Sequence, residues 1–147
     1  MFALHQRLKD DTVEVADLAL SRVLLMNDRT VPWLILVPRR AGASEVHDLS
    51  ENDRAELIEE VTRASQVIRE LYCPDKINIG ALGNLVPQLH VHVIGRFKTD
   101  RAWPGPVWGK DGAEAYGAGE LREEVARIRT ALKRLSPLQQ DSFKNEI

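Results

Sequence analysis

Gln88, His90 and His92 form the most distinctive pattern in this sequence, in an otherwise apolar run over residues 88–94. Side chains two positions apart lie on the same face of a β-strand, so these three polar side chains are expected to line up opposite the apolar ones. An imidazole can act as a nucleophile or base near neutral pH, and a neighbouring imidazole or amide can donate a hydrogen bond. The pattern therefore predicts a strand that carries a chemically reactive face.

Three interpretations of this pattern are open from the residues alone. The row can be the exposed polar face of an edge strand. A His-x-His pair can also supply two metal ligands, but His5 and His47, the other two histidines, have no spacing that indicates a third ligand. The third interpretation is covalent chemistry, in which a histidine attacks the phosphorus atom of a nucleotide.

The segments around this run indicate an α+β protein with an antiparallel sheet, because strands and helices do not alternate as they do in parallel sheets. Alternating or apolar runs predict strands at residues 12–26, 33–37, 76–79 and 89–94. Turns are expected between them at residues 27–30 and, rich in glycine, at residues 80–84.

The longest expected helix begins after Ser50, which together with Asp53 fits a capping box. Apolar residues spaced by three and four positions then define one face of an amphipathic helix: Leu57, Val61, Ala64, Ile68 and Leu71. Pro74 is expected to end this helix. A second helix is expected from about Glu114 to Leu135, followed by a polar tail beyond Pro137.

Length and composition limit the class of protein. The chain has 147 residues, 44% of them hydrophobic and 29% charged, which is typical of one globular domain and excludes a disordered chain. The formal charge of −2 argues against nonspecific binding to nucleic acid. Cys73 is the single cysteine, so no internal disulfide and no Cys-rich zinc site can form. Without a bilayer-length apolar run or a signal-peptide pattern at the N-terminus, we expect a cytoplasmic protein with no membrane partner.

From about Leu18 to Gly109, the sequence resembles the histidine triad (HIT) family. The family motif is His, apolar, His, apolar, His and two apolar residues, and residues 88–94 match it with Gln88 in place of the first histidine. Other features fall in the family's order around the motif: Asn27, Val31-Pro32, the capped helix, Asn78-x-Gly80, Gly83-Asn84 and Trp103-Pro104-Gly105.

The resemblance implies one domain over residues 1–147, with a core at about 12–110 and a C-terminal helix and tail at 111–147. Its expected fold is an antiparallel sheet of about five strands, with a long helix packed on it, a C-terminal helix, and the helices on one side. It also implies a homodimer in which two sheets become continuous.

The resemblance further implies a hydrolase or transferase that acts at the α-phosphate of a nucleotide. His90 aligns with the family nucleophile, which forms a nucleotidyl-histidine that water then cleaves. A backbone carbonyl two residues earlier orients that nucleophile, which here is the carbonyl of Gln88. His92 aligns with the last histidine, which faces the phosphate oxygens and the leaving group.

Three asparagines align with substrate-binding positions of the family. Asn27 aligns with the residue that holds the ribose hydroxyls, and Asn78 and Asn84 align with polar residues around the phosphates. Leucines at residues 20, 24 and 25 are candidates for the base pocket. Trp33 stands where some members carry another histidine.

A dinucleoside polyphosphate, such as a diadenosine polyphosphate, is the substrate that the resemblance favours. No cofactor or metal held by the protein is expected, although magnesium can arrive on the substrate because it coordinates phosphate oxygens readily. One alternative is a nucleoside phosphoramidate hydrolase, which the Trp103-Pro104-Gly105 loop favours. Another is a nucleotide-binding module with weakened catalysis, which Gln88 favours.

Overall fold

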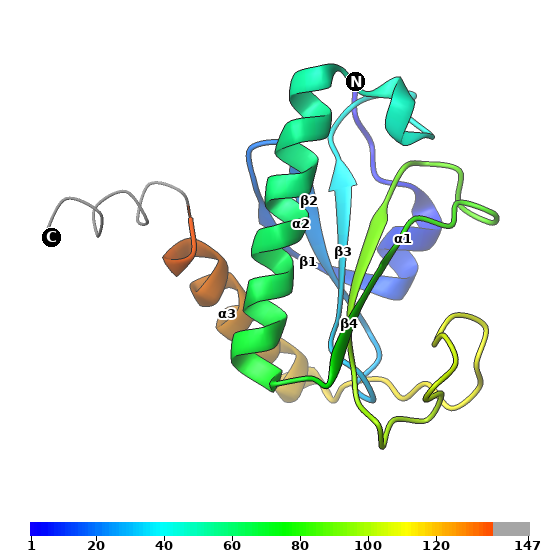
Figure 1. The fold of residues 1–147 in the computed structure, drawn as a ribbon, viewed down its shortest axis with the longest axis vertical. Helices are drawn as coiled ribbons and strands as arrows, with labels where there is room; N and C mark the ends of the chain where they lie inside the picture. The colour runs from blue at the N-terminus through cyan, green and yellow to red at the C-terminus, as the bar shows by residue number, and fades with distance from the viewer. Residues whose placement is uncertain (137–147) are drawn as a thin grey trace, which may run out of the picture.

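A five-stranded antiparallel sheet forms the centre of the protein. The structure is a computed structural model that describes residues 1–136, and the polar tail predicted beyond Pro137 lies outside this range. The strand order is β1-β2-β3-β5-β4 (Figure 1), with the strands at Thr12–Asp17 (β1), Ser21–Met26 (β2), Trp33–Pro38 (β3), Lys76–Gly80 (β4) and Val91–Arg96 (β5). The predicted α+β fold with about five strands is therefore confirmed.

The long helix α2 (Glu51–Tyr72) begins and ends as the sequence predicts. Ser50 is its N-cap and accepts a hydrogen bond from the backbone N–H of Asp53, whereas the carboxylate of Asp53 binds Arg40 instead of completing the capping box. Cys73 ends the helix in the left-handed conformation, directly before Pro74. The predicted apolar face is buried except at Leu71, which is half-buried.

The C-terminal helix α3 (Ala118–Arg134) begins four residues later than the predicted start at Glu114. Backbone N–H groups at residues 114 and 116 donate to the side chains of Asp28 and Asn27 in the β2–β3 turn. This segment is therefore pinned in an irregular conformation, and the helix begins only after Gly117.

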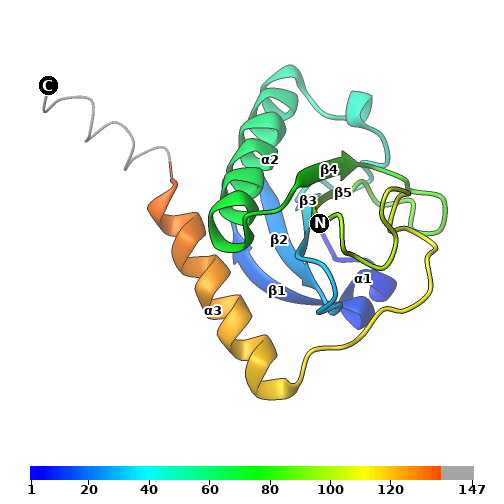
Figure 2. The same cartoon turned by 60° about the horizontal axis from the view of Figure 1, so that its bottom comes forward.

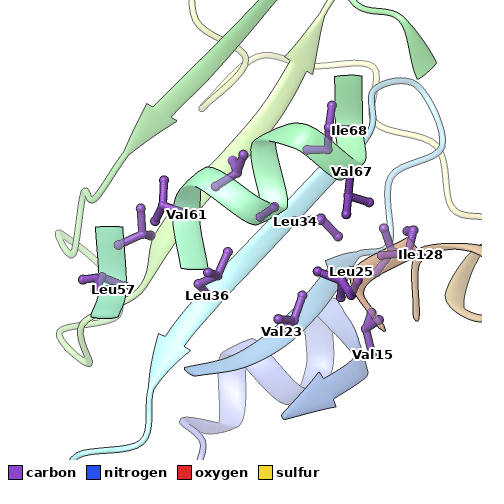
Figure 3. Close-up of a cluster of buried hydrophobic side chains, with 14 of the residues drawn as sticks. Val15, Val23, Leu25, Leu34, Leu36, Leu57, Val61, Val67, Ile68 and Ile128 are labelled. Atoms are coloured by element: carbon purple, nitrogen blue, oxygen red, sulfur yellow. The ribbon is translucent and has the colours of Figure 1, made fainter. Parts of the chain in front are cut away.

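Helices α2 and α3 pack on one face of the sheet, and their apolar side chains meet those of the strands in one cluster (Figure 3). The opposite face carries a second apolar cluster beneath the short helix α1 (Gln6–Asp11) and the loop over residues 97–117 (Figure 2). The prediction that all helices lie on one side is therefore wrong for α1. A single 3-10 turn, η1, spans Val46–Asp48. None of the helices within residues 1–136 has the length and apolarity needed to cross a membrane.

Candidate functional site

His90 and His92 lie on the face of the sheet opposite the two long helices. Alternation along β5 sends Val91 and Val93 into the core beneath α2, and His92 to the other side. Both histidines line a cavity of about 400 Å³, and their rings lie 4.9 Å apart between centroids. Each is only 6% exposed. The two histidines therefore share one face as predicted, although the ladder begins at Val91 and His90 lies just before it.

His90 is held by the hydrogen bond that the sequence predicts. Its Nδ1 lies 2.6 Å from the carbonyl oxygen of Gln88. A carbonyl oxygen only accepts, so this ring nitrogen carries a proton, and in the neutral ring Nε2 then keeps its lone pair. The neutral ring therefore offers an unprotonated nitrogen, which is the form that a nucleophile needs.

His92 lies between aromatic rings at the back of the cavity. The indole Nε1 of Trp33 donates to its Nδ1 at 3.0 Å, and the ring of Trp108 meets it edge-on with centroids 5.5 Å apart. Burial, together with the neighbouring His90, lowers the pKa of His92 to about 4. His92 is therefore neutral at physiological pH.

The side chain of Gln88 points away from this cavity. Its Oε1 accepts from the backbone N–H of His5, and its Nε2 donates to the carbonyl of Ala3, both at 2.9 Å. The side chain of Gln88 therefore does not line the cavity that holds the two histidines. Its carbonyl orients His90, while its amide fastens the N-terminal segment. Gln88 instead borders a smaller cavity of about 170 Å³, and His90 lies between the two cavities.

The three predicted asparagines occupy three different environments. Asn84 lines the cavity that holds both histidines. Asn27 borders an adjoining cavity that shares Trp33 with the first, and its Oδ1 accepts from the backbone of Tyr116. Asn78 lies on the same face of the sheet, but its Oδ1 accepts from Arg96 at 2.8 Å and it borders neither cavity.

A buried ion pair shapes the loop that closes the site. Arg96 is 1% exposed and binds Asp100 through two hydrogen bonds of 2.8 and 3.0 Å, and it also donates to the carbonyl of Gly105. The side chain of Arg96 and the backbone N–H groups of residues 97, 102 and 103 donate to Asp100 and hold its pKa well below the usual range. Arg101 donates one hydrogen bond of 2.7 Å to the carboxylate of Asp28. Both arginines are thus tied to carboxylates, and these contacts position the loop.

A model of the HIT domain family matches residues 7–99. The chain belongs to the HIT domain family. Solved structures agree with this assignment over nearly the whole chain. A histidine triad protein from Bradyrhizobium japonicum is 48% identical with a TM-score of 0.86, and the match covers 89% of this chain and 98% of that one. A histidine triad protein from Marinobacter aquaeolei VT8 is 44% identical with a TM-score of 0.88, covering 92% and 99%.

Curated relatives of this HIT domain match over a shorter stretch. The bis(5'-nucleosyl)-tetraphosphatase [asymmetrical] of Schizosaccharomyces pombe is 32% identical over 72 residues, which are 46% of this chain and 39% of that protein. The AP-4-A phosphorylase of Mycobacterium tuberculosis is 37% identical over 73 residues, which are 46% of this chain and 37% of that protein. The alignments thus span less than two fifths of the length of these relatives.

Several residues that complete the HIT domain's cavity were not among the predicted site residues. Helix α1 contributes Arg7, Leu8 and Asp11, and β2 contributes Met26 in place of the expected leucines. Trp108 reaches His92 because Gly80, which pairs with His92 from β4, has no side chain. A Cβ at Gly80 would lie 3.0 Å from the Trp108 indole. A helix as short as α1 gives little periodic signal, so the sequence pattern did not identify its contribution to the cavity.

The site offers no arrangement for a metal ion. Within residues 1–136, no group of three or more His, Cys, Asp or Glu side chains is placed to hold one. Nδ1 of each cavity histidine is also occupied by a protein hydrogen bond.

Proposed function

We propose that this HIT domain protein cleaves a nucleotide conjugate at its α-phosphate through a nucleotidyl intermediate on His90. The observation that carries the proposal is the pair of histidines in one cavity, with Nδ1 of His90 bound to the Gln88 carbonyl. The curated relatives are named for dinucleoside tetraphosphates, which supports the same substrate class here.

The reaction divides one displacement into two. Nε2 of His90 forms a bond to the α-phosphorus, and the bond from phosphorus to the leaving group breaks. The Nδ1 proton stays on the ring, donated to the Gln88 carbonyl, so the phosphorylated imidazole is a cation and departs readily. Water then attacks phosphorus, gives up a proton, and releases the nucleotide and neutral His90.

The surroundings suggest how the nucleotide is held. Leu8, Met26 and Ile35 give the cavity an apolar wall suited to a base, and Asn84 offers an amide near the histidines. We place the ribose towards Asn27 in the adjoining cavity. Asn78 is engaged by Arg96, so we assign it a role in orienting that arginine rather than in contacting phosphate.

A nucleoside phosphoramidate is a second candidate substrate, and charge favours it. Among the described residues, Arg7 is the only Lys or Arg that borders either cavity next to His90, and it lies 3.6 Å from Asp11. Glu45 adds a carboxylate to the smaller cavity. An amine leaves as a neutral molecule, so the site needs little positive charge to stabilise it. A polyphosphate leaves as an anion, whose charge would have to be neutralised by magnesium brought with the substrate.

We also propose a cytoplasmic homodimer. Strand β4 lies at an edge of the sheet, and its Ile79 is 54% exposed. A second copy that pairs with this edge would extend the sheet and cover that side chain. Light scattering of the purified chain tests the dimer directly.

The test is intact-mass analysis of protein mixed with diadenosine tetraphosphate or an adenosine phosphoramidate and quenched early. Wild type should gain one nucleotidyl group and release nucleotide, whereas His90→Ala should show no adduct and lose about 10³-fold or more in kcat/KM. His47→Ala is the matched control, because His47 is 85% exposed and borders neither cavity. Turnover that persists in His90→Ala would remove His90 as the nucleophile. Bound but unchanged nucleotide in wild type would favour the binding module.

A further inference from the structure

The hydrogen bond between Trp33 and His92 joins two side chains that are fixed in the sheet. Strands β3 and β5 pair with Ile35 opposite His92 and Trp33 opposite Ile94, so the two residues are diagonal neighbours on one face. Trp33 is 7% exposed and His92 is 6% exposed. The bond is therefore set by the strand register and does not depend on a loop.

An indole N–H can only donate a hydrogen bond. Since Nε1 of Trp33 lies 3.0 Å from Nδ1 of His92, that nitrogen must offer a lone pair. A neutral imidazole has one proton, which must then be on Nε2. His90 has the opposite arrangement, because the Gln88 carbonyl accepts from its Nδ1.

We propose that Trp33 is a positioning residue that holds His92 as the Nε2–H tautomer, so that one ring N–H and one ring lone pair face the same cavity. The catalytic consequence rests on the proposed function: His90 attacks phosphorus while His92, still neutral, donates from Nε2 to a phosphate oxygen or to the leaving group. The two hydrogen-bond partners, a backbone carbonyl for His90 and a side-chain indole for His92, thus assign different tasks to two identical side chains.

The residue type at position 33 matters for this division. A histidine at position 33 could either donate or accept at each ring nitrogen, so it would not fix the tautomer of His92. A phenylalanine there would have no hydrogen-bond donor. Trp108 also contacts His92, but only edge-on, and its buried Nε1 has no hydrogen-bond partner among residues 1–136. The titratable groups that line the cavity with His92 are His90 and, from α1, Arg7 and Asp11.

Nitrogen NMR of the histidine rings in the ligand-free, ¹⁵N-labelled protein tests the proposal without any substrate. At pH 7, wild-type His92, assigned by the loss of its signals in His92→Asn, should carry its proton on Nε2. Trp33→Phe should shift population to forms protonated on Nδ1. Trp108→Phe is the control for this readout, and its His92 should keep the Nε2–H form. A wild-type His92 protonated on Nδ1 would overturn the proposal whatever the variants do.

Kinetics supply the second readout. Loss of one hydrogen bond that orients a donor should lower kcat of Trp33→Phe about two- to tenfold, with KM changed less than about twofold. An unchanged tautomer together with an unchanged kcat in Trp33→Phe would overturn the proposal. If no adenosine phosphoramidate or diadenosine tetraphosphate is turned over by wild type, the proposed function fails, while the NMR result still decides the role of Trp33.

Discussion

The two faces of the sheet are covered by different kinds of structure. On one face, the long helices α2 and α3 bury a continuous apolar core against the strands (Figure 3). On the other, the short helix α1 and the loop over residues 97–117 (Figure 2) cover a second apolar cluster, and polar contacts of Arg96 and Arg101 also hold the loop. The cavity and both of its histidines belong to the second face.

Two buried carboxylates, one on each face, have pKa values shifted in opposite directions. Glu60, a residue of α2, is fully buried and accepts from the backbone N–H groups of Leu20 and Ser21, and burial raises its pKa. Asp100, on the cavity face, is paired with Arg96, and its pKa is lowered. Burial of apolar area supports the helical face, whereas a few directional contacts determine the shape of the cavity face.

The largest effect on stability is expected from breaking the ion pair behind the cavity. Asp100→Asn leaves the buried guanidinium of Arg96 without a carboxylate and should lower the free energy of unfolding by about 3–5 kcal/mol. Glu60→Gln, the matched change on the helical face, keeps an acceptor oxygen and should cost about 1–2 kcal/mol. Urea unfolding at pH 7 measures both. Equal losses would contradict the contrast between the faces.

An intermediate effect is expected from pH, and it should arise on the cavity face. The pKa of His92 falls from an ordinary 6.5 to about 4 on folding, so between these values the unfolded chain binds a proton that the folded protein does not. The free energy of unfolding should therefore fall as pH drops through this window, by about 2–3 kcal/mol at pH 4.5. His92→Asn, unfolded in urea at pH 7 and 4.5, should lack that part of the loss. An identical pH dependence in the variant would show that His92 does not titrate in this way.

The smallest effect is expected from the side chain of Gln88. Gln88→Ala removes its two hydrogen bonds to the N-terminal segment, which carries Arg7 and Leu8 to the cavity wall. Unfolding should change by less than about 1 kcal/mol, and KM should rise about two- to fivefold while kcat holds, because the carbonyl to His90 remains. Steady-state kinetics measure this, with Gln6→Ala as the control, since that amide binds only Asp10. A large fall in kcat would instead give the Gln88 side chain a direct part in the reaction.

Local sequence patterns were sufficient to predict helix α2 and the shared face of the two histidines. Ser50, the apolar spacing and Pro74 define α2 without any distant contact, and alternation alone placed His90 and His92 on one face. The partners of polar residues depend on distant segments. The amide of Gln88 binds residues 83 and 85 positions away, and Arg96 is buried only because Asp100 and Gly105 fold back onto it. Helix α1 is equally invisible, since its N-cap is His5, which accepts from the Arg7 N–H through Nδ1.

The attachment of residues 3 and 5 to Gln88 has a practical consequence for producing the protein. An affinity tag fused ahead of Met1 would start within a few residues of the wall that α1 forms around the cavity. A charged or histidine-rich tag at that place would add competing imidazoles and charges beside His90. Kinetic comparisons between variants should therefore be made on chains from which any such fusion has been cleaved.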